Sequence, residues 1–457
     1  MYNAFIRYPP RVLKGVGIHM TSITFSPARL SGGAPVPPAK SEAHRALLLA
    51  ALGRSECRLN GFPPPLCDDT LAMINGVTAL GGSVRADGDA LYVTPAPLPA
   101  ADAPMAECRV NACAAALRML IPAFLVRGQA VRFRMEPALF RRPLDAFEPL
   151  LKQTGGRMTR IPAGEDGLAS VEISGYMPAG AYQIDGSQSS QFASGLLIAL
   201  AHARDASGAP ASSTLTVTGP IVSRPYLDMT LRLMEQFRIS FTERSEGVFA
   251  LEPALQPSPA EVNVGGDWSQ AAVLLCMNAM GCGVMVPNLS QSGLQGDAHV
   301  VDVLRAMGMR IFHAAGGLYA ASPSHAGLMP ARIDCSDIPD LAPILALTCT
   351  QAHGVSTLTG VSRLRLKECD RLAATQELLV QLGARVEADE DSLTVYGPAR
   401  LHGGFTASAR GDHRMVMLLA AAALIADAPI TVSGVECITK SWPGFLDTYR
   451  QLGGIAE

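Results

Sequence analysis

One short stretch concentrates the residue types that could do acid–base chemistry on an anion. Between Ser362 and Leu372 the chain carries four cations and two carboxylates, among them Lys367, Glu368 and Arg371. If Lys367 opens a helix, Arg371 lies one turn further on, on the same face. An ammonium and a guanidinium would then face an anion, with a carboxylate near enough to move a proton. The plainer interpretation is the solvated start of an amphipathic helix.

Six segments elsewhere share one design, in which a short polar cluster is followed at once by an apolar, helix-like run. The clusters lie 72 to 77 residues apart, at Ser41, Ala114, Ser190, Asp267, Asp340 and Asp412. Such a regular spacing predicts a repeat architecture. Because each run is apolar almost all round, each helix should be buried within its own repeat.

Strand-like segments separate these helices, at 171–174, 214–219, 331–336 and 430–434. Each repeat is therefore expected to alternate strands and helices around one buried helix, and six repeats predict two lobes of three. Proline-rich stretches at 35–38 and 253–259 lie where such lobes would join. We expect an N-terminal part, 1–37, whose strand completes the second lobe. The first lobe would then be 38–258 and the second 259–457.

The polar clusters at the helix starts are suited to bind anions, because unpaired N–H groups and the helix dipole favour negative charge there. Serine and aspartate at these places also act as ordinary N-caps. Capping does not account for Lys40, Arg45, Arg118 and Arg414, because a cation repels the positive end of a dipole unless an anion lies between them. The recurrence predicts a site for a polyanionic ligand.

Composition excludes several classes of protein. A hydrophobic content of 48% with 17% charged residues predicts large buried cores, and a net charge of −3 excludes a globally basic nucleic-acid binder. Ten cysteines without a C-x-x-C pair indicate a reduced, cytosolic protein with neither disulfides nor zinc. The longest apolar run, 415–426, is too short to span a membrane. Residues 1–30 carry four cations and no acid, faintly like a transit peptide, but we favour a short extension.

Several motifs recur in the order and spacing of one known family. They are Lys40-Ser41 with Arg45, Arg141-Arg142-Pro143, 185–192, 223–226, Gln295-Gly296-Asp297, 338–340, 366–372, 412–415 and Lys440. On these motifs the chain resembles the 5-enolpyruvylshikimate-3-phosphate synthases, within the enolpyruvyl transferase superfamily, from about Thr21 to its C-terminus.

The resemblance implies an α/β fold of two similar lobes, each of three βαβαββ units with buried parallel helices (an inside-out α/β barrel), and an active site in the interdomain cleft. It implies transfer of the enolpyruvyl group of phosphoenolpyruvate to the 5-hydroxyl of shikimate 3-phosphate. The reaction would run by addition and elimination through a tetrahedral intermediate, on the route to chorismate and aromatic amino acids. Neither a metal nor an organic cofactor is implied. We expect a cytoplasmic monomer whose partners are these two small molecules, not nucleic acid or a membrane.

The resemblance also implies roles for individual residues. Shikimate 3-phosphate would be held by Lys40, Ser41, Arg45, Ser189, Ser190, Gln191, Ser223, Asp340 and Lys367. Phosphoenolpyruvate would be held by Lys40, Ala114, Arg142, Gln191, Arg371, Arg414 and Lys440. The reaction needs a base for the 5-hydroxyl and an acid for C3 of phosphoenolpyruvate. By resemblance these are Asp340 and Glu368, while Lys40 would protonate the departing phosphate.

The second helix start departs from the family pattern. The family usually shows Asn-Ala-Gly-Thr ahead of the helical arginine, whereas here Cys113 to Arg118 occupies the place, and Ala114 falls where the family has a glycine against phosphoenolpyruvate. Ala115 replaces a hydroxyl residue, His44 a common asparagine, and Arg363 an asparagine of some members. Because the added methyl group of Ala114 would crowd glyphosate, which is longer than phosphoenolpyruvate, we expect weaker inhibition by it.

Two other functions fit part of the pattern. The related transferase acting on UDP-N-acetylglucosamine usually carries a Lys-Asn pair near its start and a reactive cysteine in a mobile loop, whereas this chain has Lys40-Ser41 and the Ser189-Ser190-Gln191 triple. A non-catalytic sugar-phosphate-binding paralogue is supported by the alanine-rich second repeat. Binding alone does not require both Asp340 and Glu368.

Overall fold

The computed structural model describes residues 21–289, 295–314, 316–322 and 327–457. The described chain forms two compact units: unit 1 is 40–264, and unit 2 combines 21–39 with 265–457. The expected divisions were after residue 37 and after residue 258. The expectation of a short extension at the N-terminus falls on residues 1–20, outside the described residues.

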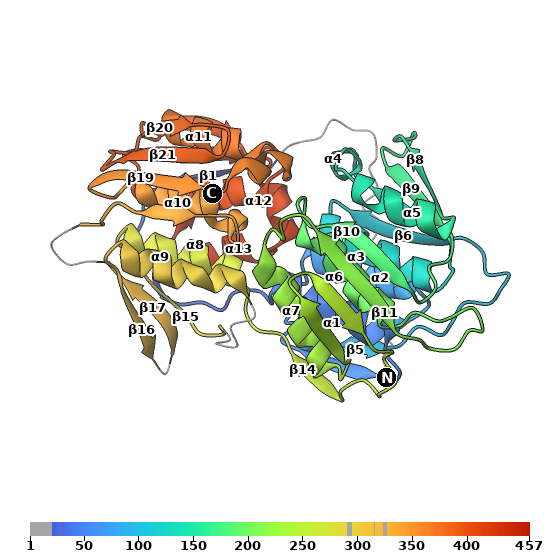
Figure 1. Ribbon diagram of the computed structural model, residues 1–457. Helices are drawn as coiled ribbons and strands as arrows, with labels where there is room; N and C mark the ends of the chain where they lie inside the picture. The colour runs from blue at the N-terminus through green and yellow to red at the C-terminus, as the bar shows by residue number, and fades with distance from the viewer. Residues whose placement is uncertain (1–20, 290–294, 315, 323–326) are drawn as a thin grey trace. The chain divides into compact units, whose positions relative to one another are not determined.

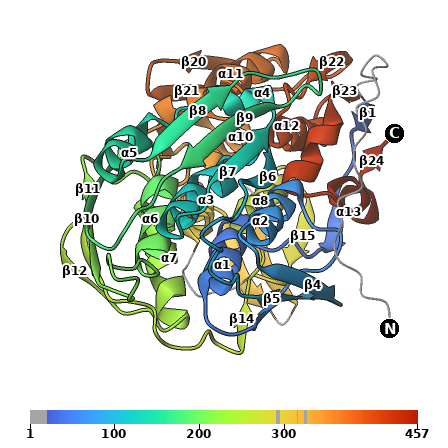
Figure 2. The ribbon, with the colours of Figure 1, turned by 90° about the vertical axis from the view of Figure 1, so that its right-hand side faces the viewer.

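Unit 1 has three buried helices that pack against one another, with its other helices and three sheets around them (Figure 2). The buried helices are α1 Lys40–Leu52, α3 Ala114–Val126 and α6 Ser190–Leu200, and the others are α2 Asp68–Ala79, α4 Pro137–Phe140, η1 Asp145–Phe147, α5 Glu148–Thr154 and α7 Arg224–Gln236. The strands are β3 Cys57–Asn60, β4 Ser83–Asp87, β5 Ala90–Thr94, β6 Ala106–Asn111, β7 Val131–Met135, β8 Arg157–Ile161, β9 Ala169–Ser174, β10 Ala181–Asp185, β11 Ser213–Thr218, β12 Phe241–Ser245, β13 Val248–Leu251 and β14 Glu261–Asn263.

Unit 2 repeats this arrangement with α8, α10 and α12 as its packed, buried helices (Figure 1). Its helices are α8 Trp268–Ala279, η2 Gly296–His299, α9 Val300–Ala306, η3 Pro339–Leu341, α10 Ala342–Cys349, η4 Ser362–Leu366, α11 Arg371–Gln381, α12 His413–Ala423, η5 Val435–Lys440 and α13 Phe445–Gln451. Its strands are β1 Ser22–Ser26, β2 Ser31–Gly33, β15 Gly283–Val286, β16 Arg310–Ala314, β17 Gly317–Ala321, β18 Arg332–Asp334, β19 Gly354–Thr359, β20 Arg385–Ala388, β21 Ser392–Gly397, β22 Phe405–Ser408, β23 Ile430–Ser433 and β24 Ile455–Ala456.

The described residues form six four-stranded sheets with one topology, and the predicted βαβαββ repeat is confirmed. In the third repeat β10 pairs in parallel with β11, β11 pairs antiparallel with β13, and β13 with β12. The other five sheets follow the same order. In the four sheets whose parallel strands follow each other in the sequence, the pair needs a crossover connection, and the buried helix supplies it. The six segments predicted as buried helices form α1, α3, α6, α8, η3 with α10, and α12.

Three strands reach their sheets from distant parts of the sequence. In unit 1, β14 pairs in parallel with β3 and completes the first repeat after the third has been formed. In unit 2, β2 pairs in parallel with β15, and β1 pairs antiparallel with β23 and β24. Each unit is therefore closed by a segment next to one of the two points where the chain passes between units.

The expectation that Lys367 opens a helix is wrong. Lys367 is extended after η4, and α11 begins only at Arg371. Asp370 sets this start, because its carboxylate accepts a hydrogen bond from Ala373 N at 3.0 Å and so caps the helix. Lys367 and Arg371 still lie together, since both bind Asp340 Oδ1, at 3.0 and 2.8 Å.

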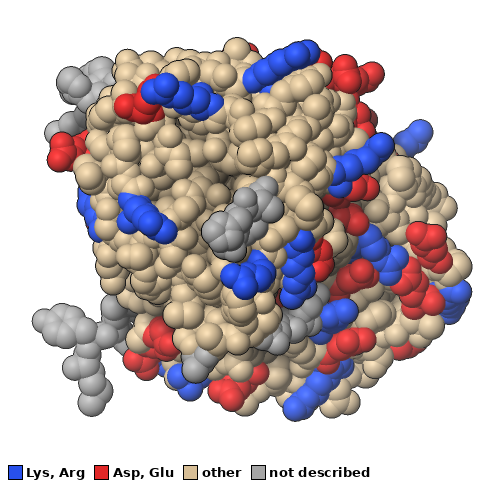
Figure 3. Space-filling view, turned by 90° about the vertical axis from the view of Figure 1, so that its left-hand side faces the viewer, with Lys and Arg blue, Asp and Glu red and all other residues tan. Residues whose placement is uncertain are grey.

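Surface and helix properties agree with the composition. On the face drawn in Figure 3, acidic and basic side chains are interspersed over the described residues. In the described part of the chain, no helix combines the length and the apolar character needed to cross a bilayer.

Candidate active site

The strongest cluster of charge described in unit 2 is built around the guanidinium of Arg371. Its side chain is buried and binds three carboxylates: Nε donates to Asp412 at 2.9 Å, Nη1 to Asp340 at 2.8 Å and Nη2 to Glu368 at 2.6 Å. Asp412 is also buried and caps α12 through Arg414 N at 2.9 Å. The cluster thus joins the starts of α11 and α12 to the turn before α10.

Asp340 is the carboxylate in this cluster that faces the most cations. Lys367 Nζ lies 3.0 Å from Oδ1, and Arg414 Nη2 lies 3.8 Å from Oδ2. Burial would raise the pKa of Asp340, but Lys367, Arg371 and Arg414 outweigh it and hold that pKa well below its usual range. Burial also lowers the pKa of Lys367, which Asp340 opposes. Asp340 is therefore a charged acceptor, and a weak base as long as these cations surround it.

Glu368 bridges Arg371 and a second cation. Lys440, at the end of η5, lies 3.7 Å from Glu368 Oε1 and is nearly buried. The carboxylate thus lies between two positive charges from different helices. Lys440 and Glu368 come within reach of each other although 72 positions separate them in the chain.

The start of α8 holds the last cation of this cluster. Arg414 donates to the Ser269 carbonyl oxygen at 3.1 Å through Nη1, and to Ser269 Oγ at 2.7 Å through Nη2. The N-termini of α8, α10 and α12 therefore converge within unit 2. Asp267 caps α8 by accepting from Gln270 N at 3.2 Å, so the plain capping interpretation holds for these acids as well.

In unit 1 the first residue of α1, Lys40, forms an ion pair with Asp69 of α2 at 3.0 Å. An external anion was expected to neutralise Lys40 at this helix start. Asp69 supplies a negative charge there from within unit 1. His44, one turn along α1, is fully buried, and its Nε2 lies 2.9 Å from the Asp69 carbonyl oxygen. Burial lowers the pKa of His44 to about 4, so the imidazole is neutral near pH 7. Ser41 lies beside Lys40 and is half-buried.

The predicted ligand residue Arg45 is buried in unit 1, with 1% of its surface exposed. Its guanidinium donates to Thr230 Oγ1 at 2.6 Å, to Ser194 Oγ at 3.0 Å and to the carbonyl oxygens of Ser41 and Tyr226 at 2.7 and 2.9 Å. These bonds tie α1 to α6 and α7. The geometry supports a structural role and gives no support to the predicted contact with a phosphate.

The starts of α3 and α6 also lie together in unit 1. Arg118 donates to Gln191 Oε1 at 3.0 Å and stacks over the Phe192 ring at 4.7 Å. Burial, with the nearby charge of Arg142, lowers the pKa of Arg118 to about 10, and Asp145 opposes the shift. Gln191 N bonds the capping Ser189 Oγ at 3.3 Å.

The start of α3, which departs from the family pattern, is capped by a thiol instead of a hydroxyl. Cys113 Sγ accepts from Ala116 N at 3.4 Å, and Ala114, the first residue of α3, is buried. The methyl group of Ala114 is therefore packed at the helix start. The turn before it is unusual as well, because Asn111 has a φ of 49°.

Ser223 is the predicted ligand residue with a strained backbone. It precedes α7 with a φ of 54°, in the left-handed region that costs a non-glycine residue about 1–2 kcal/mol. Such strain concentrates at functional sites. Arg224 beside it is held by Glu243 and Asp228, both at 2.7 Å, so the turn is fixed from the helix side.

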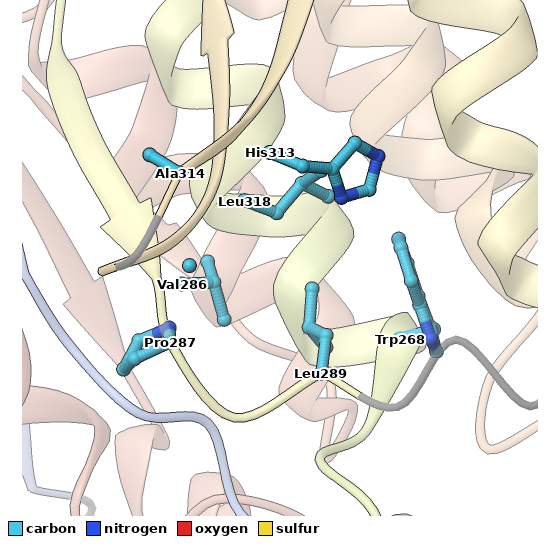
Figure 4. A pocket seen from close by; sticks show the side chains of 8 residues that line it. Trp268, Val286, Pro287, Leu289, His313, Ala314 and Leu318 are labelled. Atoms are coloured by element: carbon cyan, nitrogen blue, oxygen red, sulfur yellow. The ribbon is translucent and has the colours of Figure 1, made fainter.

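A separate pocket lies on the other side of the α8 start (Figure 4). It is lined by Trp268, Val286, Pro287, Leu289, His313, Ala314, Gly317 and Leu318. The pocket contains none of the predicted substrate residues. Within the described residues, no group of three His, Cys, Asp or Glu side chains is arranged to hold a metal ion.

Of the predicted residues, Asp340, Glu368, Lys367, Arg371, Arg414 and Lys440 come together in unit 2, and Gln191 with Ser189 and Ser190 marks the α6 start in unit 1. Sequence reasoning missed Asp69 as the partner of Lys40, and it missed Ser269 and Asp297 as the chain of hydrogen bonds to Arg414. It treated Asp412 only as a helix cap. Asp297 stood in a quoted motif without a role.

Comparisons with known proteins first define the class. The chain matches the structure of the EPSP synthase from Acinetobacter baumannii with a TM-score of 0.74 at 21% identity, covering 95% of this chain and 99% of that one. It matches the enolpyruvyl transferase NikO from Streptomyces tendae with a TM-score of 0.71 at 18% identity, over 95% and 98% of the two chains. The fold is therefore that of the enolpyruvyl transferases.

Sequence comparison defines the family. The model for EPSP synthase (3-phosphoshikimate 1-carboxyvinyltransferase) matches residues 25–449. The 3-phosphoshikimate 1-carboxyvinyltransferase of Clostridium beijerinckii is 30% identical over 96% of this chain and 99% of its own length. That of Methanocorpusculum labreanum is 34% identical over 94% and 97%. The chain belongs to the EPSP synthase family, and it is a transferase of the shikimate pathway.

Proposed function

We propose a division of labour for the reaction that this chain catalyses, the transfer of the enolpyruvyl group from phosphoenolpyruvate to the 5-hydroxyl of shikimate 3-phosphate with release of phosphate. One observation carries the proposal: Asp340 and Glu368, the two groups suited to move protons, lie in one cluster with four cations. A reaction between two anionic substrates that also moves protons needs both kinds of group.

Asp340 is the base that takes the proton from the 5-hydroxyl. Its pKa is held well below the usual range by Lys367, Arg371 and Arg414, although burial opposes this. When the substrates' phosphate and carboxylate groups bind Lys367 and Arg414, these cations are partly neutralised. The basicity of Asp340 then rises, so that the carboxylate becomes an effective base only when both substrates are bound.

Glu368 is the acid that protonates C3 of phosphoenolpyruvate. Arg371, Arg414 and Lys440 bind the phosphate and carboxylate of this substrate, and guanidinium groups suit such oxyanions. The same cations stabilise charge that develops in the tetrahedral intermediate. Because Glu368 already lies between Arg371 and Lys440, its carboxyl group is held close to the anion they bind.

The unit 1 residues bind mainly shikimate 3-phosphate. Its contacts are Lys40, Ser41, Ser189, Ser190, Gln191 and Ser223, with Lys367 and Asp340 from unit 2. Lys40 also protonates the departing phosphate, and Ala114, Gln191 and Arg142 complete the phosphoenolpyruvate site. Arg45 would have to exchange four internal hydrogen bonds to join them. The stronger support is for Arg45 as the anchor of α1.

The proposal also covers the location, the oligomeric state and the partners of the enzyme. We place the enzyme in the cytoplasm as a monomer with the two small molecules as its partners, without nucleic acid or membrane. The location of the active site between the lobes and the effect of Ala114 on glyphosate stay predictions. Transfer to UDP-N-acetylglucosamine and a non-catalytic role are not favoured, because the family match runs over nearly the whole chain.

The test is phosphate release with both substrates together and with each alone. We expect release only with both, and a loss of at least about a hundredfold in Asp340→Asn, the scale of acid–base catalysis. Asparagine keeps an oxygen for Arg371, so the loss reports on the base. Asp302→Asn is the matched control, since Asp302 is exposed on α9. Release from one substrate alone, or a loss under about tenfold in Asp340→Asn, would contradict the proposal.

A further inference from the structure

The Gln295-Gly296-Asp297 motif has no part in the roles above, yet its side chains hold the start of α8. Gln295 Nε2 donates to the Gly266 carbonyl oxygen at 3.0 Å, and Gln295 Oε1 accepts from Trp268 N at 2.8 Å. These two bonds flank Asp267, the N-cap of α8. The motif therefore fixes the backbone of the first turn of the helix.

Asp297 continues this clamp to a side chain. Asp297 accepts a short hydrogen bond from Ser269 Oγ. Ser269 in turn accepts hydrogen bonds from both terminal nitrogens of Arg414, from Nη1 at its carbonyl oxygen and from Nη2 at Oγ. All three residues are less than 8% exposed. One chain of contacts thus runs from Asp297 through Ser269 to a cation of the phosphoenolpyruvate site.

The hydroxyl of Ser269 has a single hydrogen, and this settles the direction of the chain. Arg414 Nη2 can only donate, so Ser269 Oγ must turn a lone pair toward it. The hydroxyl hydrogen must then point elsewhere, and Asp297 Oδ2 receives it. A carboxylate that only accepts is the partner that keeps the hydroxyl in this orientation.

The Nε of Arg414 is the guanidinium nitrogen that Ser269 does not hold. It is buried and has no hydrogen-bond partner within the described residues, and a buried donor of this kind costs stability unless something binds it. Ser269 holds Nη1 and Nη2, so the plane of the guanidinium is fixed before the ligand arrives. Preorganised donors of this kind are what an anion site needs.

We propose that Ser269 and Asp297 are positioning residues that orient Arg414 for the anionic groups of phosphoenolpyruvate. The inference rests on the proposed function, since it names Arg414 as a phosphoenolpyruvate ligand. Ser269 and Asp297 act through Arg414 and do not touch the substrate themselves. Their loss therefore affects one substrate more than the other.

The orientation depends on the protonation of Asp297. Burial, together with the neighbouring charges of Asp340 and, to a smaller extent, Asp267, raises the pKa of Asp297 to about 6. Ser269 and Arg414 oppose this shift. Near pH 7.5 Asp297 is ionised and accepts from Ser269. Below its pKa it carries a proton, and the direction of the hydrogen bond is no longer fixed.

The test is steady-state kinetics of Ser269→Ala and Asp297→Asn, with the surface variant Asp302→Asn as control. In Ser269→Ala we expect the KM for phosphoenolpyruvate to rise about ten- to a hundredfold, the effect of one hydrogen bond to a charged group. The KM for shikimate 3-phosphate should change less than about threefold. Asp297→Asn removes the charge, and its amide group can donate as well as accept, so at pH 7.5 its KM for phosphoenolpyruvate should rise about three- to tenfold, the difference between a charge-assisted and a neutral hydrogen bond.

The pH profile adds a readout that a merely structural role would not move. Between pH 5.5 and 7.5 the ratio of the two KM values for phosphoenolpyruvate, wild type over Asp297→Asn, should rise towards one as the pH falls through about 6, the pKa of Asp297, because the protonated wild-type side chain then resembles asparagine. Taking the ratio cancels the titration of the substrate itself. A flat ratio overturns the role of Asp297 as an ionised acceptor.

The outcomes separate this inference from the proposed function. If the wild type turns over and Ser269→Ala leaves the KM for phosphoenolpyruvate unchanged, the positioning role is wrong and the function stands. An equal rise in both KM values also overturns it. If the wild type shows no turnover, the proposed function fails, and crystal structures of Ser269→Ala and wild type decide the positioning role. A displaced Arg414 guanidinium supports it, and an unmoved one refutes it.

Discussion

The variant Asp297→Asn should make unit 2 more stable, although it removes a charge from a hydrogen-bonded cluster. Burial and the Asp340 charge raise the pKa of Asp297 to about 6, from an ordinary value of 3.8. The ionised form is therefore disfavoured in the folded protein. Asparagine has nearly the same shape and mimics the neutral form, so it avoids this cost.

The size and sign of the change in the free energy of unfolding follow from the shift in the pKa of Asp297. A raised pKa means that the folded state binds the proton more tightly than the unfolded state, so stability falls as the pH rises from about 3.8 to about 6. Two units at about 1.4 kcal/mol each give a cost of about 3 kcal/mol above pH 7. At pH 5 the cost is about 1.5 kcal/mol, because the folded carboxyl is then mostly protonated.

The assay is urea unfolding followed by tryptophan fluorescence at pH 5.0 and 7.5. Both tryptophans of the chain, Trp268 and Trp442, lie in unit 2, so the signal reports the unit that contains Asp297. We expect Asp297→Asn to exceed wild type by about 1.5 kcal/mol at pH 5.0 and about 3 kcal/mol at pH 7.5. The exposed Asp302→Asn should stay within about 0.5 kcal/mol at both pH values.

The pH dependence carries the reasoning. If Asp297→Asn is less stable than wild type at pH 7.5, then hydrogen bonding from Ser269 and attraction to Arg414 outweigh the cost of burying the charge. If the difference is the same at both pH values, Asp297 does not titrate in this range. Either result refutes the argument from burial.

Two further predictions concern buried guanidinium groups. Arg371→Met leaves Asp412 fully buried without its cation, so the free energy of unfolding of unit 2, measured by tryptophan fluorescence, should fall by about 3–5 kcal/mol. A loss under about 1 kcal/mol would show that the cluster rearranges. Arg45→Lys has no fork to serve Thr230 and Ser194 together, so the thermal midpoint of unfolding should drop with little change in the KM for shikimate 3-phosphate. A higher KM with an unchanged midpoint would instead assign Arg45 to the substrate.

The sequence was sufficient to predict the repeat and its buried helices, because both depend on local patterns. The run after Asp412 is apolar all round, and a helix of that kind must be buried wherever it lies. The caps at Ser189, Asp267 and Asp412 are equally local, since a cap acts within one turn. These features needed no knowledge of the rest of the fold.

The pairing of charges could not be predicted in the same way. Arg371 meets Asp412 across 41 positions, and Arg45 meets Thr230 across 185, so both pairs exist only because different repeats pack together. From the sequence alone, a cation at a helix start suggested an external anion. The structure shows that internal acids such as Asp69 and Asp412 satisfy part of that need. Lys367 was misplaced for a related reason, because the cap at Asp370 delays the helix beyond it.

The strand β1 has a consequence for how the chain is made on the ribosome. Its Thr24 binds Thr431, 407 positions later, so β1 emerges long before the strand it pairs with. At about 5–20 residues per second the wait lasts roughly 20–80 seconds. Unit 1 is continuous in the sequence and can fold during that time, while Phe25, buried in the finished protein, stays without its sheet. The nascent chain therefore carries the β1 segment without its sheet partners for most of its synthesis.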